Sequence, residues 1–169
     1  MKGKRAVEAV PIATTASEIK LLYLEALTLV ERLHRRLLDV IKDEFDRSDR
    51  SDVNAVQALL IFNIGDAELT PGELRTRGYY LGSNVSYNLK KLLETGYIHH
   101  QRSRLDRRSV RVSLTQKGHE VAKIVNDLYD RHVVLVDRAG TITPAEFREM
   151  NRSLQWLERF WSDQIVYRP

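Results

Sequence analysis

A single pair of strand-like segments interrupts a sequence that is otherwise rich in helical patterns. The segments "YIHHQR" (97–102) and "SVRVSL" (109–114) alternate apolar and polar residues with a period close to two. Most of the remaining chain repeats its apolar residues at spacings of three and four, the period of an α-helix. The sequence therefore predicts a mainly α-helical fold with one small β-hairpin, whose turn is rich in arginine.

Two short helices are predicted directly before the hairpin. Thr70-Pro71-Gly72-Glu73 combines an N-cap threonine, a proline at the first helical position and a glutamate at the third, and Gly78 ends this helix. A second helix is predicted from Ser83 to Thr95 and is closed by Gly96. Its apolar stripe consists of Val85, Leu89, Leu92 and Leu93. Two short helices, a tight turn and a following hairpin are typical of a winged helix-turn-helix.

Long amphipathic helices are predicted on both sides of this unit. A capping box at Thr15-Ala16-Ser17-Glu18 starts the first, and its apolar residues keep helical spacing as far as Phe45. Asp52 is the expected cap of a shorter helix that ends at Gly65. After the hairpin, the predicted helix starts are Thr115 and Thr143-Pro144-Ala145-Glu146, and Gly140 separates the two helices.

Positive charge is concentrated in one part of the chain. The net charge is +4, yet residues 75–117 hold ten Lys and Arg against two acidic residues, so this region carries +8 and the remainder −4. The hairpin contributes Arg102, Arg104, Arg107, Arg108 and Arg111, with Asp106 among them. An asymmetry of this kind is expected where one region faces a polyanion.

Side chains on the 83–95 helix and the hairpin fit double-stranded DNA. The helix residues expected off the apolar stripe are Ser83, Asn84, Ser86, Tyr87, Asn88, Lys90 and Lys91. Small polar groups in the first turn suit contacts to base edges, and lysines behind them suit phosphates. The wing residues expected at DNA are Arg102, Arg104, Asp106, Arg107 and Arg108, with Asp106 orienting a guanidinium. Either Arg104 or Arg107 fits the tip.

Composition and motifs limit where the protein can be located and which kinds of chemical site it can contain. The chain has no cysteine, which excludes disulfides, thiolate zinc sites and thiol redox sensors. No stretch approaches the roughly 18 apolar residues of a membrane span, and residues 1–17 lack the apolar core of a signal peptide, so we expect a cytoplasmic protein. Catalytic glycine loops, nucleophile elbows and zinc-protease motifs are missing, so we expect no enzyme and no cofactor. His99 and His100 are neighbours in a strand and would point to opposite faces, which argues against a metal site.

These elements divide the chain into four parts. We expect a mobile arm over 1–16, an N-terminal dimerisation helix over 17–51, a winged helix-turn-helix DNA-binding domain over 52–114 and C-terminal dimerisation helices over 115–169. The long helices cannot bury their apolar stripes on so small a DNA-binding domain. A two-fold homodimer buries the same patch on both subunits and is the expected solution.

The stretch "RLDRRSVRVSLTQKG" (104–118) resembles the wing and following helix start of MarR-family transcription regulators, which read Asp-x-Arg-Asp-x-Arg, alternating apolar residues and Leu-Thr-x-x-Gly. The matching residues are Asp106, Arg108, Val112, Leu114, Thr115 and Gly118. Ser103 and Leu105 replace the first Asp and Arg of the motif, so the family's minor-groove arginine does not map onto one residue here.

The stretch "SNVSYNLKKLLETGYI" (83–98) is similar to the recognition helix of the same family, and "GYYLGSNVSYNLKKL" also resembles the LdtR-type branch, which is linked to cell-wall transpeptidase genes. The resemblance implies a homodimer on a pseudo-palindromic operator with half-sites roughly 34 Å apart. It also implies that a small aromatic effector binds between the dimerisation helices and the DNA-binding domain. His34 and His132 are candidates to line that pocket.

Two other functions also fit the sequence. A non-specific nucleic-acid-binding or nucleoid-architectural protein would need basic charge alone, because phosphate contacts give affinity without sequence choice. A helical interaction module could instead dock its basic hairpin on an acidic protein.

Overall fold

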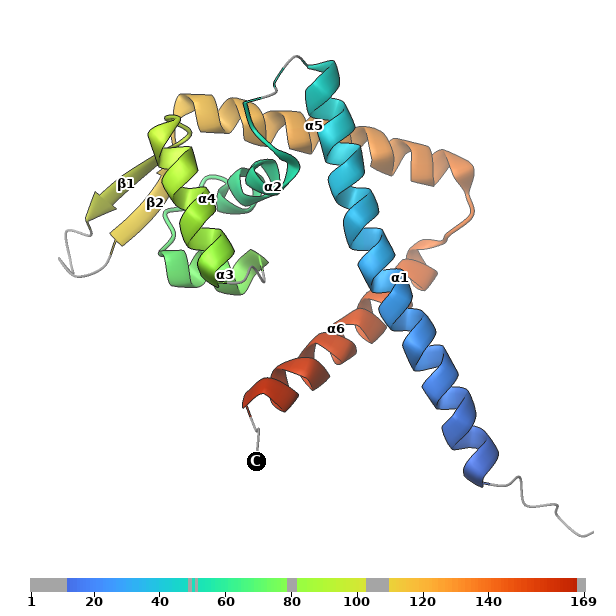
Figure 1. Ribbon diagram of the computed structural model, residues 1–169. Helices are drawn as coiled ribbons and strands as arrows, with labels where there is room; N and C mark the ends of the chain where they lie inside the picture. Colours follow the sequence, from blue (N-terminus) through green and yellow to red (C-terminus); the bar gives the residue numbers. More distant parts are fainter. Residues whose placement is uncertain (1–11, 49, 51, 79–81, 103–109, 167–169) are drawn as a thin grey trace, which may run out of the picture.

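The fold is mainly α-helical with a two-stranded antiparallel hairpin, which confirms the predicted fold class (Figure 1). The computed structural model describes residues 12–48, 50, 52–78, 82–102 and 110–166. The elements in chain order are α1 (Ile12–Arg47), α2 (Ala55–Ile64), α3 (Pro71–Gly78), α4 (Gly82–Glu94), β1 (Ile98–Arg102), β2 (Val110–Leu114), α5 (Gln116–Ala139) and α6 (Pro144–Val166). No helix in this described part of the chain has the length and apolarity needed to cross a membrane.

The hairpin packs on the helices through one of its faces. In its register Ile98 lies opposite Leu114 and His100 opposite Val112. Opposed residues of an antiparallel pair share a face, and on this face Ile98, Val112 and Leu114 are buried. Leu69, between α2 and α3, extends the pairing, because its backbone N–H donates to Val112 O at 3.0 Å and its carbonyl accepts from Val112 N at 2.7 Å.

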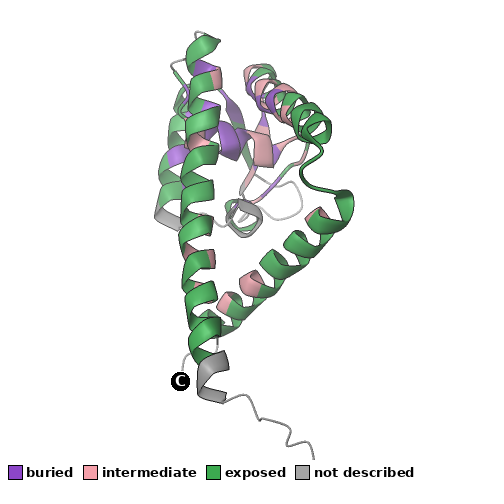
Figure 2. Cartoon of the chain, turned by 90° about the vertical axis from the view of Figure 1, so that its right-hand side faces the viewer, coloured by how far each residue is buried: buried purple, intermediate pink, exposed green. Residues whose placement is uncertain are grey.

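The hydrophobic core lies in the reading head, which we define as residues 52–114, and in the parts of α1 and α5 that adjoin it (Figure 2). Helix α2 is apolar around most of its circumference and is the centre of this core, in contact with α1, α3 and α5. Each surrounding element adds at least one fully or nearly fully buried side chain: Ile41, Leu74, Val85, Leu92, Tyr97, Val112, Val121 and Val125.

Gly118 allows the first turn of α5 to pack closely against the residue that precedes β1. A Cβ atom at Gly118 would lie 2.2 Å from the carbonyl oxygen of Tyr97 and 3.2 Å from the Cβ of Leu114. The first distance is far below any van der Waals contact, so only glycine fits without moving the backbone. This contact is the physical reason for the glycine in the Leu-Thr-x-x-Gly motif of the sequence.

Three predicted helix starts are confirmed. The Oγ1 of Thr115 accepts from Gly118 N at 3.1 Å, and Thr70 and Thr143 each form a reciprocal capping box with the glutamate three residues later. Helix α5 ends before Gly140, as predicted, and Gly140 adopts the left-handed conformation.

Two predicted helix starts are wrong. Helix α1 begins at Ile12, inside the expected arm 1–16, so Thr15 is within the helix and not its cap. Helix α2 is capped by Asn54, in a reciprocal box with Gln57, and not by Asp52. Asp52 does not cap α2 because its carboxylate bonds to Tyr97 and Lys117.

Most of the length of α1 and all of α6 lie outside the core. Helix α6 has no buried residue, and its contact with α1 includes a hydrogen bond from Trp161 Nε1 to the Tyr23 hydroxyl at 3.0 Å. Large apolar side chains are exposed on α1, on the C-terminal part of α5 and on α6: Ile19, Leu22, Leu33, Val133, Leu135, Leu154 and Ile165. The predicted apolar stripes of these helices are present, but no other described part of the same chain packs over the residues named here.

Candidate nucleic-acid interface

Helix α4 buries one stripe and exposes a polar face beside it. Val85, Leu89 and Leu92 are buried as predicted, but Leu93, which was expected in the stripe, is 41% exposed. The exposed side chains on the other faces include Asn84, Ser86, Tyr87, Lys90 and Lys91. Tyr87 is 62% exposed, an unusual degree for an aromatic side chain, so its ring is available to a partner. The backbone of Ser83 lies in the first turn of α4.

Asn88 is not on the exposed face, which corrects the prediction. Its side chain is 8% exposed, and its amide Nδ2 donates to the carbonyl oxygen of Asn84 at 2.9 Å. Its position, three residues after Val85 and four before Leu92, places it beside the buried stripe of α4, where only a polar group with a partner is tolerated. Asn88 therefore supports the helix, and the polar face consists of the remaining residues.

The two lysines of α4 share one acidic partner. Lys90 Nζ lies 3.9 Å from a Glu94 carboxylate oxygen, and Lys91 Nζ lies 3.4 Å from the other. All three side chains are substantially exposed, and exposed pairs of this kind contribute at most about 1 kcal/mol. Such weak pairs are readily exchanged for contacts with phosphate groups.

The wing consists of β1, β2 and the segment between them. Arg102 is the last residue of β1, whereas Arg104, Asp106, Arg107 and Arg108 lie outside the described residues. Arg111, counted in the same basic run, is held at the base of the hairpin, because its Nη1 donates to the carbonyl oxygen of Glu68 at 3.1 Å. It fixes the hairpin to the segment before α3.

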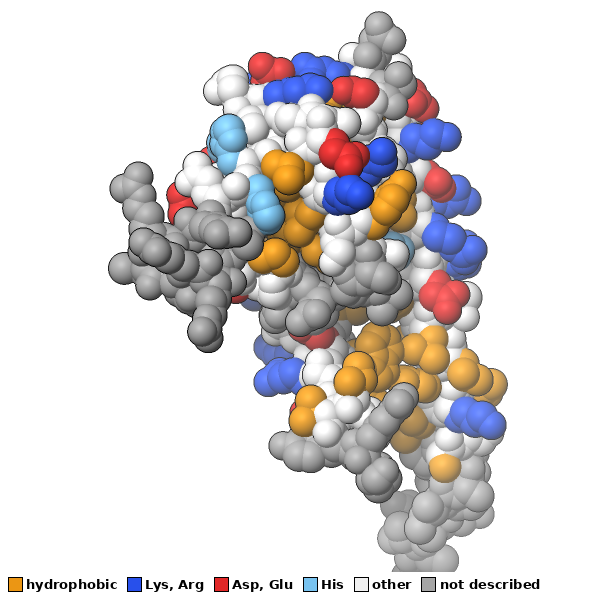
Figure 3. Space-filling view, turned by 60° about the vertical axis from the view of Figure 1, so that its left-hand side comes forward, with side chains coloured by type: hydrophobic (Ala, Val, Ile, Leu, Met, Phe, Trp, Pro, Cys, Tyr) orange, Lys and Arg blue, Asp and Glu red, His pale blue; other side chains and the backbone are white. Residues whose placement is uncertain are grey.

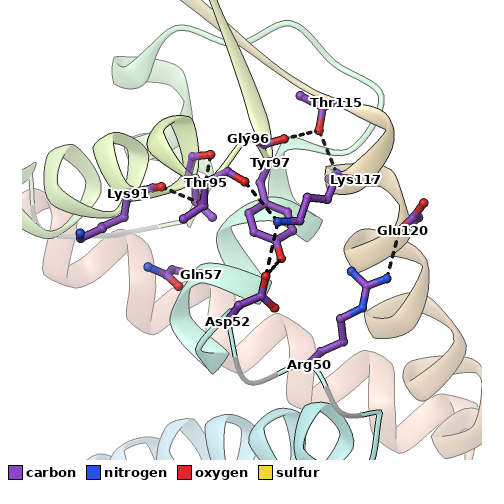
Figure 4. A network of polar contacts seen from close by, with 12 residues as sticks. Arg50, Asp52, Gln57, Lys91, Thr95, Gly96, Tyr97, Thr115, Lys117 and Glu120 are labelled. Atoms are coloured by element: carbon purple, nitrogen blue, oxygen red, sulfur yellow. Dashed lines mark hydrogen bonds and ion pairs between the residues drawn. The ribbon is translucent and has the colours of Figure 1, made fainter.

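A polar network anchors α4 and the hairpin to the rest of the protein (Figure 4). The Tyr97 hydroxyl donates to Asp52 Oδ2 at 2.5 Å, and Lys117 Nζ lies 3.4 Å from the same oxygen. Lys117 Nζ also donates to Thr95 O at 3.2 Å and lies 4.0 Å from the centre of the Tyr97 ring. The network, which we call the Tyr97 junction, joins the α1–α2 linker, the α4–β1 turn and the start of α5.

Burial and the contacts within the Tyr97 junction shift the pKa values of Asp52 and Tyr97 in opposite directions. The hydrogen bond from Tyr97, and then the contacts with Lys117, lower the pKa of the Asp52 carboxyl below its usual value. Burial, and then the bond to Asp52, raise the pKa of the Tyr97 hydroxyl. The carboxylate and the neutral phenol are therefore the stable forms at neutral pH. Sequence reading missed this network because a lone Asp and a Tyr 45 residues later carry no shared pattern.

Besides a depression between α1 and α6, whose lining includes Tyr23 and Trp156, two depressions lie near the long helices. One, of about 640 Å³, is formed by α1, the α1–α2 linker, the start of α2 and α4; its lining includes Leu38, Lys42, Phe45, Asn84 and Tyr87. The other, of about 540 Å³, lies between α5 and α6, and His132 is on its wall with Tyr129 and Phe147. His34 is exposed on α1 and lines neither of them. No group of three potential metal ligands occurs among the residues that the structure describes.

The sequence is similar to a characterised transcription factor over most of its length. The exopolysaccharide II synthesis transcriptional activator ExpG of Rhizobium meliloti (strain 1021) is 32% identical over 148 residues, which cover 86% of this chain and 74% of that protein. A family model described as the MarR family matches residues 51–109, a range that spans α2 to β1 and the segment after it. The chain belongs to the MarR family. It is therefore a DNA-binding transcriptional regulator and not an enzyme, as the sequence predicted.

Solved structures of two other proteins share the fold. The Streptococcus pneumoniae FabT structure in complex with DNA matches with a TM-score of 0.66 and 23% identity, covering 83% of this chain and 98% of that one. Staphylococcus aureus MarR in complex with salicylate and kanamycin matches with a TM-score of 0.67 and 20% identity, covering 88% of this chain and 98% of that one. At these identities the similarity establishes the fold.

We predict that the Tyr97 junction makes stability depend on pH through Asp52. Because the pKa of Asp52 is lowered on folding, its contribution is fully present above its unfolded value of 3.8 and is lost as the pH falls below it. Urea unfolding of Asp52→Asn and wild type should therefore differ by a constant amount between pH 7 and 5, and by less near pH 3.5. Tyr97→Phe should cost about 1.5–3 kcal/mol at pH 7, the range for a hydrogen bond to a charged group.

The matched control is Asp66→Asn, because the Asp66 side chain is 99% exposed. It should change the free energy of unfolding by less than about 0.5 kcal/mol at pH 7. A difference between wild type and Asp52→Asn that persists unchanged at pH 3.5 would contradict the assignment.

Proposed function

We propose that this MarR-family protein acts in the cytoplasm as a homodimer on a pseudo-palindromic operator in double-stranded DNA. Each reading head would place α4 in the major groove and its wing in the adjacent minor groove. The observation that carries this proposal is the exposed polar face of α4, with Asn84 and Tyr87 toward its N-terminus and two lysines behind them, next to a hairpin rich in arginine. A helix of this kind presents base-reading groups first and phosphate-binding groups behind them.

The exposed apolar faces of α1, α5 and α6 support the dimer. Leu33 is 63% exposed, Leu135 60% and Ile165 73%, and each of the three helices exposes several large apolar side chains. Contiguous apolar patches on soluble proteins mark interaction surfaces. A second copy of the chain related by two-fold symmetry covers such a surface on both subunits and also sets the spacing of the two reading heads.

Introducing charge into this surface should separate the subunits. Wild type should sediment as a dimer and, on a duplex selected from a random pool, protect two half-sites roughly 34 Å apart. Leu33→Glu or Leu135→Glu should sediment as a folded monomer and lose most operator affinity, because one head then binds alone. Gln116→Glu adds the same charge at an exposed position near the reading head and should remain a dimer. A wild-type monomer that binds the operator as one copy would overturn the dimer.

The wing and the recognition helix should contribute differently to binding. Arg107→Ala should weaken binding to all duplexes alike and reduce the slope of log affinity against log salt by about 1, as expected when an arginine no longer reaches a phosphate or the groove. Asn84→Ala and Tyr87→Ala should instead reduce the preference for the operator over mismatched sites, by roughly 1–3 kcal/mol for each base that the truncated side chain no longer reads.

Arg36→Ala removes an arginine that is 81% exposed on α1 and is the control for a general loss of charge. It should leave both the salt slope and the sequence preference unchanged. Equal losses on every duplex from the helix and wing variants would contradict this division of roles, and would favour a non-specific architectural protein.

We also propose that an aromatic acid binds in the depression between α1 and α4. Phe45 and Tyr87 supply aromatic surface there, and Lys42 supplies a cation for a carboxylate. Because Asn84 and Tyr87 belong both to this depression and to the polar face of α4, a ligand there competes directly with DNA for the helix. The MarR structure that contains salicylate provides a suitable probe.

Salicylate should lower the operator affinity of the wild type, because it binds the DNA-free state better. Lys42→Ala should shift the required salicylate concentration upward by about tenfold, since it removes one charge-assisted hydrogen bond to the carboxylate. Lys20→Ala removes an exposed lysine of α1 that does not line the depression and should respond as the wild type does. Operator binding that is insensitive to salicylate, or equal shifts in both variants, would contradict the site.

A further inference from the structure

We propose that His100 binds a phosphate group of DNA, together with Lys90 and Ser86 of α4. The site would take one phosphodiester of the strand that runs between the major groove read by α4 and the minor groove entered by the wing. This inference rests on the proposed function, since it requires α4 and the wing to occupy adjacent grooves.

The position of His100 on the hairpin is the first argument. His100 lies opposite Val112 and therefore on the packed face of the hairpin, two residues beyond the buried Ile98. Ile98 is 3% exposed and Val112 is 1% exposed, but His100 is exposed. The buried part of this face therefore ends before His100, and the His100 imidazole lies at the edge of the core. His99 belongs to the opposite face of the same strand.

A depression of about 310 Å³ next to His100 is the second argument. Leu89, Ile98 and Val112 form its buried floor, and Ser86, Lys90, Leu93 and His100 line it from α4 and β1. Figure 3 shows this side of the molecule, where histidine side chains stand beside hydrophobic surface and a cluster of Lys, Arg and acidic side chains lies near it. The depression therefore combines an apolar base with polar groups on two elements.

The geometry of B-form DNA supplies the third argument. The major and minor grooves are neighbours separated by a single sugar-phosphate strand. When a helix occupies the first groove and a hairpin the second, that strand must pass over the surface between them. In this protein the surface between α4 and β1 is the depression that holds Ser86, Lys90 and His100. Its apolar floor suits the sugar, and its hydroxyl, ammonium and imidazole groups suit the phosphate oxygens.

The charges around His100 favour an anion. Lys90 is the only permanently charged residue that lines the depression among the described residues, and its contact with Glu94 is long, at 3.9 Å. Glu94 also contacts Lys91. From α3 the depression is lined by Pro71, and from β2 by Val112, so neither element adds a charged group there. The Lys90 ammonium group and the His100 imidazole therefore line the same depression, and none of the described residues that line it is acidic.

A phosphate contact through an imidazole links DNA binding to protons. Protonated imidazole offers two N–H donors, and phosphate binds it in preference to the neutral ring. Binding then takes up a proton, so affinity should fall as the pH rises from 6 to 8.

The test compares two neighbouring histidines in the full-length protein. Operator affinity is measured by fluorescence anisotropy at pH 6 and 8 and at several salt concentrations for wild type, His100→Gln and His99→Gln. His100→Gln should weaken binding roughly threefold to tenfold at pH 6 and much less at pH 8, and should reduce the salt slope by about 1 at pH 6. His99→Gln should retain the wild-type pH dependence and salt slope. His100→Arg should bind as tightly at pH 8 as at pH 6.

Chemically modified operators identify the phosphate. A neutral methylphosphonate is placed at one backbone position at a time between the major-groove and minor-groove contacts. At the position that His100 contacts, the modification should remove the difference between wild type and His100→Gln, because the two changes delete the same interaction. Thermal unfolding of His100→Gln confirms that the variant is folded.

The outcomes separate this inference from the proposed function. If wild type binds a two-half-site operator but His100→Gln and His99→Gln behave alike, the phosphate site is wrong and the proposed function stands. If no methylphosphonate position removes the difference, His100 acts through the fold and the inference is also overturned. If wild type shows no preference for any duplex, the proposed function itself fails.

Discussion

The packing of Tyr97 is the constraint on which the rest of the structure depends. Its ring is fully buried at the point where α4 has ended and β1 begins, its carbonyl oxygen lies against Gly118, and its hydroxyl donates to Asp52. Tyr97 therefore helps to set how α4, the hairpin and the start of α5 lie relative to one another. A winged helix depends on that relation, because the helix and the wing must reach two neighbouring grooves at once.

The same junction connects the reading head to the long helices. Asp52 and Arg50 lie in the linker after α1, and Arg50 pairs with Glu120 of α5 at 3.0 Å. Arg131, further along α5, pairs with Glu44 of α1. These contacts join the head to α1 and α5, the helices whose remaining apolar surface we assign to the dimer. A change in the way two subunits pack would therefore be passed to α4 as a movement of the whole head.

The excess of positive charge and most of the exposed apolar surface lie in different parts of the molecule. Residues 75–117, which include α4 and the wing, carry a net charge of +8, whereas most exposed large apolar side chains lie on α1, α6 and the end of α5. Each surface requires a different partner, a polyanion for the first and another apolar surface for the second. The depression at His100 lies within the first surface and the one at Lys42 lies between the two. This placement is why we assign a phosphate to one and a regulatory ligand to the other.

The sequence by itself determined the element order, the fold class, three helix caps and three of the four stripe residues of α4, because helix caps and apolar periods depend on neighbouring residues. It also indicated the basic wing and the MarR resemblance. Only the tertiary structure decided that Asp52 bonds to Tyr97 instead of capping α2, and that the Asn88 side chain is buried and bonds to the backbone of α4. It also decided that Arg111 holds the base of the hairpin and that His100 shares a depression with Lys90. Each of these features depends on how separate elements pack against one another, and a local sequence pattern does not specify that packing.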